Sequence, residues 1–544
     1  MRRTLSLLAL VLATLPAAAG RRQEESPLAR VEEAYADLVD ARGAIGFIDS
    51  GFVATYGGKD RKAWEEIRKA KLKEMQELLP AVPEEKLPAR ERRGLKLMQE
   101  AVEAAAAEGA PALAPAGNCQ DAQRAGLDYK QLREALYACF DEVGNHLEFE
   151  GKRESRLSGF ELLTTMPEAE RRKQMFLAYG PLWQAINAKN EPDSPYRRLI
   201  KLAAADAAQK KGSEIDAAAK TLGVTAAEVE RWLEQILETW RQSTPATPIE
   251  PWDYRYWAGE CDRELARTAP RGQMRDVSAR FYRDLGASDA LRTVIYDIEP
   301  RDGKAPVAYT DYVRMGRMAG GKWQSTVVRI SASYPRGGYG LLGELIHEEG
   351  HAVHFLALRT SPAFMDLGDS LFVESFADVP AWSMVEPAWQ KKYLGRSAPV
   401  ATCRRGAYAG VMLDVAWSLF EARMLREPSA DPNEVWTEIT SKYLHIVPHP
   451  EYAWWAWRVQ LVHLPGYMVN YGLGSVLTAD LRARIREQIG PFDTGNRRWY
   501  GWVSENLLKT GREQETADLL RRFLGRPVSP EALQKELARM REAK

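Results

Sequence analysis

Two histidines bracket a glutamate in the run His347-Glu348-Glu349-Gly350-His351. On a helix, His347 and His351 leave the same face one turn apart, because they are separated by four residues. Two neutral imidazole nitrogens at this spacing can bind one divalent metal ion, and Zn²⁺ suits them best. Glu348 is rotated by about 100° from His347, which places its carboxylate beside the open position of the metal. The spacing predicts one zinc ion per chain, with Glu348 as general base.

A zinc ion with two histidine ligands needs a further protein ligand, and several acids follow His351. We predict Glu374 as this ligand, because Asp378 lies one helical turn after it. Asp378 can then accept the outward N–H of a ligand histidine and fix its tautomer. Three protein ligands leave a fourth position for water, which is typical of catalytic zinc. Asp366 and Asp369 are competing acids, but neither belongs to a helical ExxxD pair.

The alternative is an amphipathic helix that binds no metal. It accounts for the apolar residues around the motif but not for the histidines, because burying them with a glutamate would be costly without a metal. His354, one turn beyond His351, is expected to be an ordinary helix histidine, since three ligands already fill the site.

Helical patterns dominate the segments that must position these residues. Amphipathic stretches cover 62–79, 85–107 and 217–239, and helices continue from 337 to the carboxyl end. Short β signals appear at 293–297 and 323–333. The second predicted strand ends just before the metal helix, where an exposed edge can hold an extended peptide by backbone hydrogen bonds; the alternative is a covered edge. The sequence predicts a mainly α fold with a small β-sheet next to the metal helix.

The chain divides into three predicted parts. Residues 1–19 have the order of a secretory signal: a charged start, an apolar run from Leu5 to Leu15 and small residues before the cleavage site. Residues 20–118 form an N-terminal helical region that ends in an Ala/Pro-rich loop, and 119–544 form the catalytic region. We therefore expect an exported protein, periplasmic or extracellular after cleavage of the signal peptide.

The composition limits the classes of binding partner to be expected. Among 544 residues, 28% are charged and the net charge is zero, so nothing suggests nucleic acid or an anionic membrane. Beyond the signal, no stretch approaches the ~20 apolar residues of a stable membrane insertion. A monomer or weak dimer is expected.

The four cysteines, Cys119, Cys139, Cys261 and Cys403, have no metal-type spacing. In an exported protein they can form one or two disulfides, with Cys119 and Cys139 the closest pair along the chain, or they can remain free and buried.

Several motifs resemble one family. The run from His347 to His354 is similar to the HExGHxxH motif of the thimet oligopeptidase family of zinc peptidases. Residues 251–254 resemble its PWDxxY element, 297–304 its D-x-x-PRxGK segment and 523–529 its closing FLGRxPS-type stretch. The resemblance runs in order over about 240–530. It implies a helical ellipsoid with a deep central channel and zinc at its floor, which admits short unfolded peptides.

One departure concerns the third ligand. The thimet-type segment usually reads ExPSQ, whereas Glu374 is followed here by Asp378, as in the angiotensin-converting enzyme family, which shares the fold. The branch within the group therefore stays open.

The resemblance also implies donors for the oxyanion. In the family a histidine followed by a tyrosine-rich helix supplies them, and the matching run here is 463–471. By this match Tyr471 is the oxyanion donor, and Tyr467 and His463 bind substrate or assist. The spacing departs by about one residue, and the last tyrosine of the usual run falls on Gly474. The alternative for these residues is simple packing.

Together these expectations describe an oligopeptidase or peptidyl-dipeptidase acting on short peptides. Two other classes stay open: a peptide-binding protein of this fold without turnover, and a zinc hydrolase of a non-peptide amide. A cation that captures a terminal carboxylate would favour exopeptidase action, with Arg329, Arg336 and Arg458 as candidates that the sequence does not rank.

Overall fold

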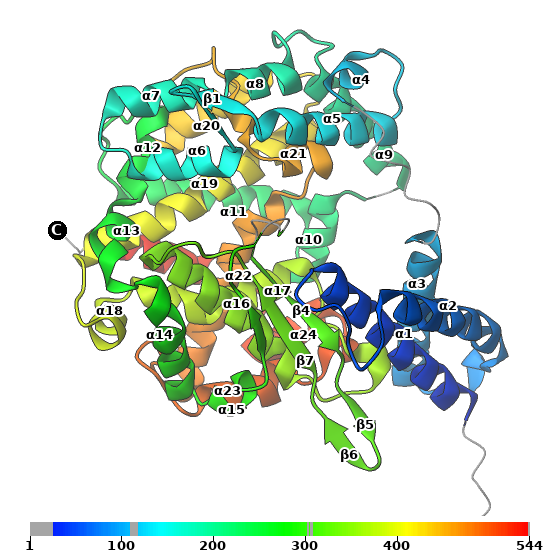
Figure 1. Ribbon diagram of the computed structural model, residues 1–544. Helices are drawn as coiled ribbons and strands as arrows, with labels where there is room; N and C mark the ends of the chain where they lie inside the picture. Colours follow the sequence, from blue (N-terminus) through cyan, green and yellow to red (C-terminus); the bar gives the residue numbers. More distant parts are fainter. Residues whose placement is uncertain (1–25, 109–117, 211, 302–303, 305–307, 542–544) are drawn as a thin grey trace, which may run out of the picture.

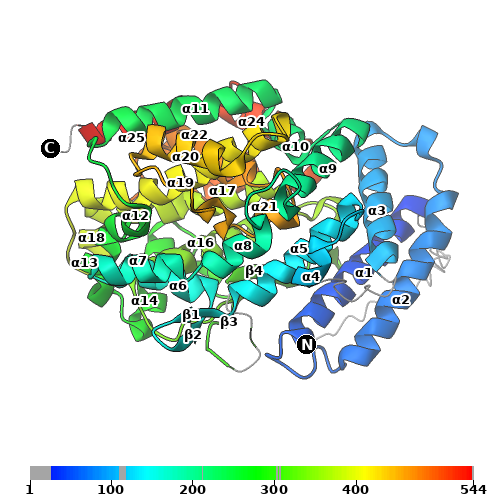
Figure 2. The same ribbon diagram turned by 90° about the horizontal axis from the view of Figure 1, so that it is seen from above.

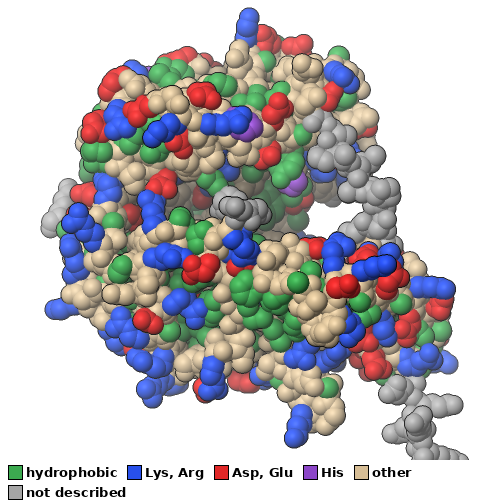
Figure 3. Space-filling model, viewed as in Figure 1, with side chains coloured by type: hydrophobic (Ala, Val, Ile, Leu, Met, Phe, Trp, Pro, Cys, Tyr) green, Lys and Arg blue, Asp and Glu red, His purple; other side chains and the backbone are tan. Residues whose placement is uncertain are grey.

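The computed structural model describes residues 26–108, 118–210, 212–301, 304 and 308–541, so the predicted signal at 1–19 and most of the Ala/Pro-rich loop lie outside the described residues. Helices form two halves, one above the other in Figure 1, with α22 (Val469–Ile489) near the centre. Figure 3 shows the surface hollowed between the halves. Within the described ranges, no helix has the length and apolar character that a membrane crossing requires. The predicted mainly α fold is confirmed.

The N-terminal helices form an arm beside the lower half, blue in Figure 1. Asp37 and Asp40 of the first helix form ion pairs with Arg317. The same helix approaches a strand so closely that a Cβ at Gly43 would stand 2.5 Å from the carbonyl oxygen of Val313. The arm is thus fastened to the central sheet. Its helices are α1 (Pro27–Asp49), α2 (Arg61–Leu78) and α3 (Ala89–Glu108).

The upper half is helical apart from one short hairpin. Its helices begin at good capping residues: Asp128 and Gln131, for example, form a reciprocal capping box at the start of α5. The elements of this half are α4 (Cys119–Gln123), α5 (Tyr129–Gly144), β1 (Leu147–Phe149), β2 (Lys152–Glu154), α6 (Arg156–Thr165), α7 (Ala169–Leu177), α8 (Gly180–Asn187), α9 (Pro195–Lys210), α12 (Pro251–Ala258), α19 (Val400–Arg426), α20 (Pro432–Leu444) and α21 (Gln460–His463).

A three-stranded sheet lies beside the metal-motif helix. β7 (Val327–Ser331) is its central strand, parallel to β3 (Ile295–Asp297) and antiparallel to β4 (Tyr309–Arg314). The predicted exposed edge of the strand at 323–333 is therefore wrong, because β3 and β4 cover both edges of β7. The first part of that segment instead forms β6 (Lys322–Gln324), which pairs with β5 (Arg317–Ala319).

The lower half holds the remaining helices, and Figure 2 shows α11 and α25 side by side along one edge of the molecule. They are α13 (Glu260–Leu265), α14 (Arg271–Asp284), α15 (Ser288–Leu291), α16 (Tyr339–Ala357), α17 (Ser370–Ala381), α18 (Pro387–Leu394), α23 (Trp499–Val503), α24 (Thr516–Leu524) and α25 (Glu531–Ala538), with α10 (Glu214–Leu222) and α11 (Ala226–Ser243) alongside.

The helix predicted over 217–239 is two helices. Gly223 adopts a left-handed conformation, with φ of 72°, and ends α10. Thr225 then opens α11 through a capping box with Glu228. The amphipathic pattern continues across both helices, so it did not reveal that one helix ends at Gly223 and the next begins after Thr225.

All four cysteines are paired. Cys119 of α4 is bonded to Cys139 of α5, and Cys261 of α13 to Cys403 of α19. The second bridge closes a separation of 142 residues and links α13 to α19.

Candidate metal centre

Helix α16 presents the two motif histidines on one face. Their Nε2 atoms are 3.1 Å apart, and the side chain of His351 is nearly buried, whereas that of His347 is 22% exposed. Two imidazole nitrogens that face each other at this distance can share a hydrogen bond or bind one metal ion between them.

Glu374 of α17 completes the cluster because the two helices pack very closely. A Cβ at Gly350 would stand 2.6 Å from the carbonyl oxygen of Ala377, so only glycine fits there. Oε2 of Glu374 lies 3.3 Å from Nε2 of His347 and 3.6 Å from Nε2 of His351. Ligands at 2.0–2.1 Å in a tetrahedral zinc site are about 3.3–3.4 Å from one another. The donor set and its spacing fit zinc.

Asp378, one turn after Glu374, accepts from Nδ1 of His347 at 2.7 Å. Burial lowers the pKa of His347, but Asp378 and Glu374 outweigh burial and the pKa is raised. Burial raises the pKa of Glu374, and the two histidines outweigh it in the opposite direction. With Nδ1 held by Asp378, Nε2 of His347 is the nitrogen left to face the cluster.

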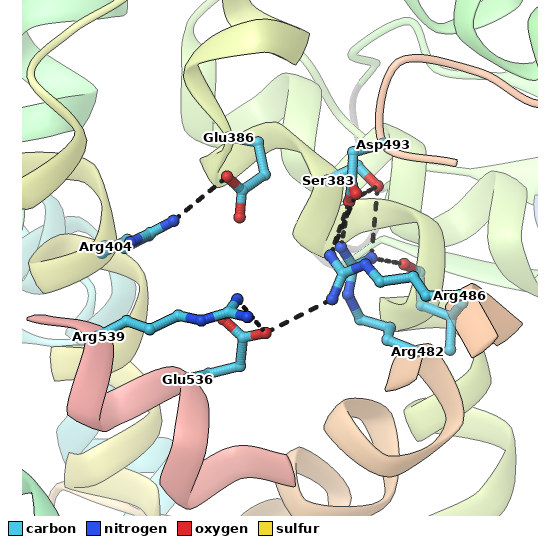
Figure 4. A network of polar contacts seen from close by, with 9 residues as sticks. Ser383, Glu386, Arg404, Arg482, Arg486, Asp493, Glu536 and Arg539 are labelled. Carbon is cyan, nitrogen blue, oxygen red and sulfur yellow. Dashed lines mark hydrogen bonds and ion pairs between the residues drawn. The ribbon is translucent and has the colours of Figure 1, made fainter. Parts of the chain in front are cut away.

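A polar network fastens the far end of α17 (Figure 4). Arg482 of α22 donates to the carbonyl of Val379, next to Asp378, and pairs with Asp493. Asp493 also accepts from Arg486 at 3.0 Å and from Ser383 at 3.2 Å. The helix that carries Glu374 and Asp378 is therefore anchored to the core of the lower half.

Glu348 is buried beside the cluster and is held by the edge strand β4. Thr310 donates its hydroxyl to Oε2 of Glu348 at 2.7 Å and contacts the backbone oxygen of the same residue at 2.9 Å. Glu348 is only 5% exposed. One carboxylate oxygen is thus oriented by Thr310, and the other remains for a proton transfer.

Tyr467 and Tyr471 lie within electrostatic reach of Glu374, whose charge contributes to the raised pKa of both phenols after the larger effect of burial. Tyr471 is 40% exposed and accepts from Nε2 of Gln460 at 3.0 Å. His463 instead lies against Tyr137, with ring centroids 4.4 Å apart, and Glu374 is not among the groups that affect its pKa. The two tyrosines lie within the electrostatic reach of Glu374, whereas His463 packs against Tyr137 of α5.

The neighbouring acid Glu349 has a structural role. It accepts from Tyr296 at 2.9 Å and from Ser278 at 3.1 Å, and burial raises its pKa to about 7. His354 packs against Phe372 and Phe376, and burial lowers its pKa to about 3, so its ring is neutral. Neither side chain contributes a donor atom to the cluster.

The three arginines considered as binders of a terminal carboxylate lie in different surroundings. Arg329 is buried and donates to the hydroxyl of Tyr309, and Arg336 pairs with Glu161 on the surface. Arg458 lines a cavity. The tryptophans that precede it, Trp454, Trp455 and Trp457, are buried packing residues.

Thr310 and Gln460 were not predicted. Residues 309–314 are rich in aromatic and β-branched residues, a strand signal that could have located β4. No local pattern could have indicated that Thr310 meets Glu348, because the contact joins residues 38 apart.

No family model matches the sequence. Over 287 residues the chain is 25% identical to oligopeptidase A of Escherichia coli (strain K12), and the match covers 47% of this chain and 41% of the relative. The chain therefore spans less than half the length of this curated relative.

Solved structures match over nearly the whole chain. Metallocarboxypeptidase 1 of Trypanosoma cruzi aligns with a TM-score of 0.51 at 14% identity, covering 94% of this chain and 99% of that one. The M32 carboxypeptidase of Deinococcus radiodurans R1 gives 0.52 at 14% identity, with 95% and 98% covered. The carboxypeptidase of Pyrococcus furiosus gives 0.50 at 16% identity, with 94% and 97% covered. The chain thus has the fold of these helical carboxypeptidases, and the resemblance to the oligopeptidase group of zinc metallopeptidases is confirmed by its similarity to oligopeptidase A.

Proposed function

We propose that this protein is a zinc-dependent metallopeptidase that hydrolyses short peptides. The carrying observation is the cluster of His347, His351 and Glu374, whose donor atoms lie within 4.8 Å of one another beside the buried Glu348. One zinc ion per chain would be held by these three side chains.

A bound zinc ion supplies Lewis acidity, which activates water and polarises a peptide carbonyl. Glu348 takes one proton from the attacking water, whose oxygen forms a bond to the carbonyl carbon. Glu348 then gives that proton to the amide nitrogen as the carbon–nitrogen bond breaks. The hydrogen bond from Thr310 restrains the carboxylate of Glu348.

Tyr471 stabilises the oxyanion. Its oxygen accepts a hydrogen bond from Gln460, so its own proton remains available for donation to the substrate. Tyr467 borders the same space and binds substrate.

The hollow between the halves suits extended peptides (Figure 3). β4 is the edge strand beside Glu348, so it takes the substrate-pairing role first assigned to the strand at 323–333.

An oxidising compartment agrees with the two disulfides. Together with the signal-like residues 1–19, they support export to the periplasm or the extracellular space.

The function is tested by removing and restoring the metal. Protein treated with a chelator should lose cleavage of a mixed short-peptide library, and one equivalent of Zn²⁺ should restore it. Cleavage by the metal-free protein would contradict the proposal, as would a fully zinc-loaded protein that cleaves no peptide.

A further inference from the structure

A cavity of about 510 Å³ lies in the upper half between α6, α12 and α19, which lie side by side in Figure 1. It contains none of the predicted metal ligands. Three arginines from separate segments line it: Arg156 of α6, Arg255 of α12 and Arg458, which precedes α21.

The positive charge of this cavity is only partly balanced. Arg458 pairs with Asp414 of α19. Among the described residues, no carboxylate lies within ion-pair distance of Arg255, whose guanidinium instead stacks over Phe160 at 4.1 Å. The other acid of the wall is Asp262, whose pKa burial raises to about 6 against the lowering effect of Arg263. Three guanidinium groups and two carboxylates therefore line the cavity, and Arg255 has no carboxylate partner among the described residues.

The arginines also affect one another. Burial and, after it, the charges of Arg255 and Arg156 together lower the pKa of Arg458 to about 9, against an opposing effect of Tyr471. Burial lowers the pKa of Arg255 to about 10. All three remain charged at neutral pH, and an anion in the cavity would relieve their repulsion.

Two residues of the cavity wall contact Tyr471, the proposed oxyanion donor. Arg458 lies 5.4 Å from the ring of Tyr471, and Gln460, which also lines the cavity, donates to the hydroxyl of Tyr471. Tyr471 in turn lies within reach of the charge of Glu374. A single tyrosine thus separates the arginines from the proposed site of bond cleavage.

The remaining wall leaves room for a side chain. A Cβ at Gly410 of α19 would meet nothing within 4 Å, so the space reaches the helix backbone there. Leu157, Phe160, Leu413 and Trp417 supply an apolar surface.

We propose that this cavity binds the C-terminal residue of a peptide substrate, with its carboxylate on Arg255 and Arg458 and its side chain against the apolar wall. The inference rests on the proposed peptidase function and deepens it. Because the carboxylate is fixed beside Tyr471, cleavage occurs a short, constant distance from the C-terminus, and the enzyme acts as an exopeptidase or peptidyl-dipeptidase.

The test compares one blocked peptide as its free acid and as its C-terminal amide. Binding is measured by titration calorimetry to zinc-loaded Glu348→Gln protein, which permits binding without turnover. The free acid should bind at least 10-fold more tightly than the amide. Arg255→Gln in this background should weaken binding of the free acid about 10- to 100-fold and leave binding of the amide unchanged.

Arg255→Lys keeps the charge and should restore part of the preference, which separates loss of charge from loss of folding. Gly410→Leu fills the cavity without touching an arginine and should weaken binding of the acid as well. Arg336→Gln, at the surface pair with Glu161, is the matched control and should change neither ligand.

Equal affinity for acid and amide, or a selective loss in Arg336→Gln, would overturn the proposal. Acetate should compete with the acid peptide; acetate or chloride binding that leaves acid and amide equal would mean that the cavity takes free anions only. If the wild type cleaves no peptide but Glu348→Gln protein still prefers the acid, the peptidase proposal fails and the carboxylate site stands.

Discussion

Gly350 of the metal helix lies directly against Ala377 of α17, where a Cβ would stand 2.6 Å from the carbonyl oxygen. This contact sets the distance between the helix that carries the two histidines and the helix that carries Glu374. A residue inside the motif therefore controls the geometry of the site without binding the metal.

Gly350→Ala should push the helices apart and weaken zinc binding. It should also lower the free energy of unfolding by about 1–3 kcal/mol. In an unconstrained helix the same change would stabilise the protein by about 1 kcal/mol. Gly46→Ala in α1, where a Cβ meets nothing within 4 Å, is the control and should be neutral or stabilising. Zinc affinity from chelator competition and the melting temperature check both variants; equal behaviour would refute the packing argument.

Asp378→Asn should lower zinc affinity about 10- to 100-fold, because the hydrogen bond to Nδ1 of His347 loses its charge. Asp369→Asn, at the start of the same helix and outside the cluster, should leave affinity unchanged. A competition titration with a chromogenic chelator measures both, and equal affinities in the two variants would exclude this role of Asp378.

Thr310→Val should lower kcat about 10-fold with little change in KM, because it removes a hydrogen bond to the carboxylate that moves the proton. Thr310→Ser keeps the hydroxyl and should recover most of the rate. Steady-state kinetics on one short peptide decide this, and an unchanged kcat in Thr310→Val would show that Glu348 needs no such support.

The buried acid Glu421 of α19 should make the stability of the folded protein depend on pH. Its Oε2 accepts from the backbone N–H of Met468 at 2.8 Å, which fixes the segment between Tyr467 and Tyr471. Burial raises its pKa to about 8, against weaker lowering by the N–H groups of Gly466 and Met468. Since the folded pKa lies above the unfolded value of about 4.3, the stability that the neutral acid contributes is present at low pH and is lost as pH rises through about 8.

Glu421→Gln should remove that loss. The free energy of unfolding of the variant relative to the wild type should rise by up to about 1.4 kcal/mol per pH unit between pH 5 and 8. Urea unfolding at pH 5, 6.5 and 8 measures it, with exposed Glu103→Gln on α3 as control. A difference that does not change with pH would contradict the burial of a titrating acid.

The ligand set could be predicted because helix geometry relates its members within each of two pairs. His347 and His351 share one face, and the ExxxD pair of Glu374 and Asp378 repeats the same spacing on a second helix. The structure brings three of these side chains within 4.8 Å and Asp378 behind them.

Contacts between distant segments could not be predicted in this way. Thr310 reaches Glu348 only because β4 pairs with β7, and the covered edges of β7 follow from two strands far apart in sequence. The pairing of Cys261 with Cys403 likewise depends on α13 packing against α19. Local periodicity identified the elements, while their neighbours were set by packing.

The central claim is tested most directly by comparing the wild type with Glu348→Gln at equal zinc content, on the same short-peptide library. We expect products from the wild type alone, with a rate at least 1,000-fold lower in the variant. Equal cleavage by the two proteins would show that Glu348 is not the base, and no cleavage by either at one zinc per chain would contradict the peptidase account.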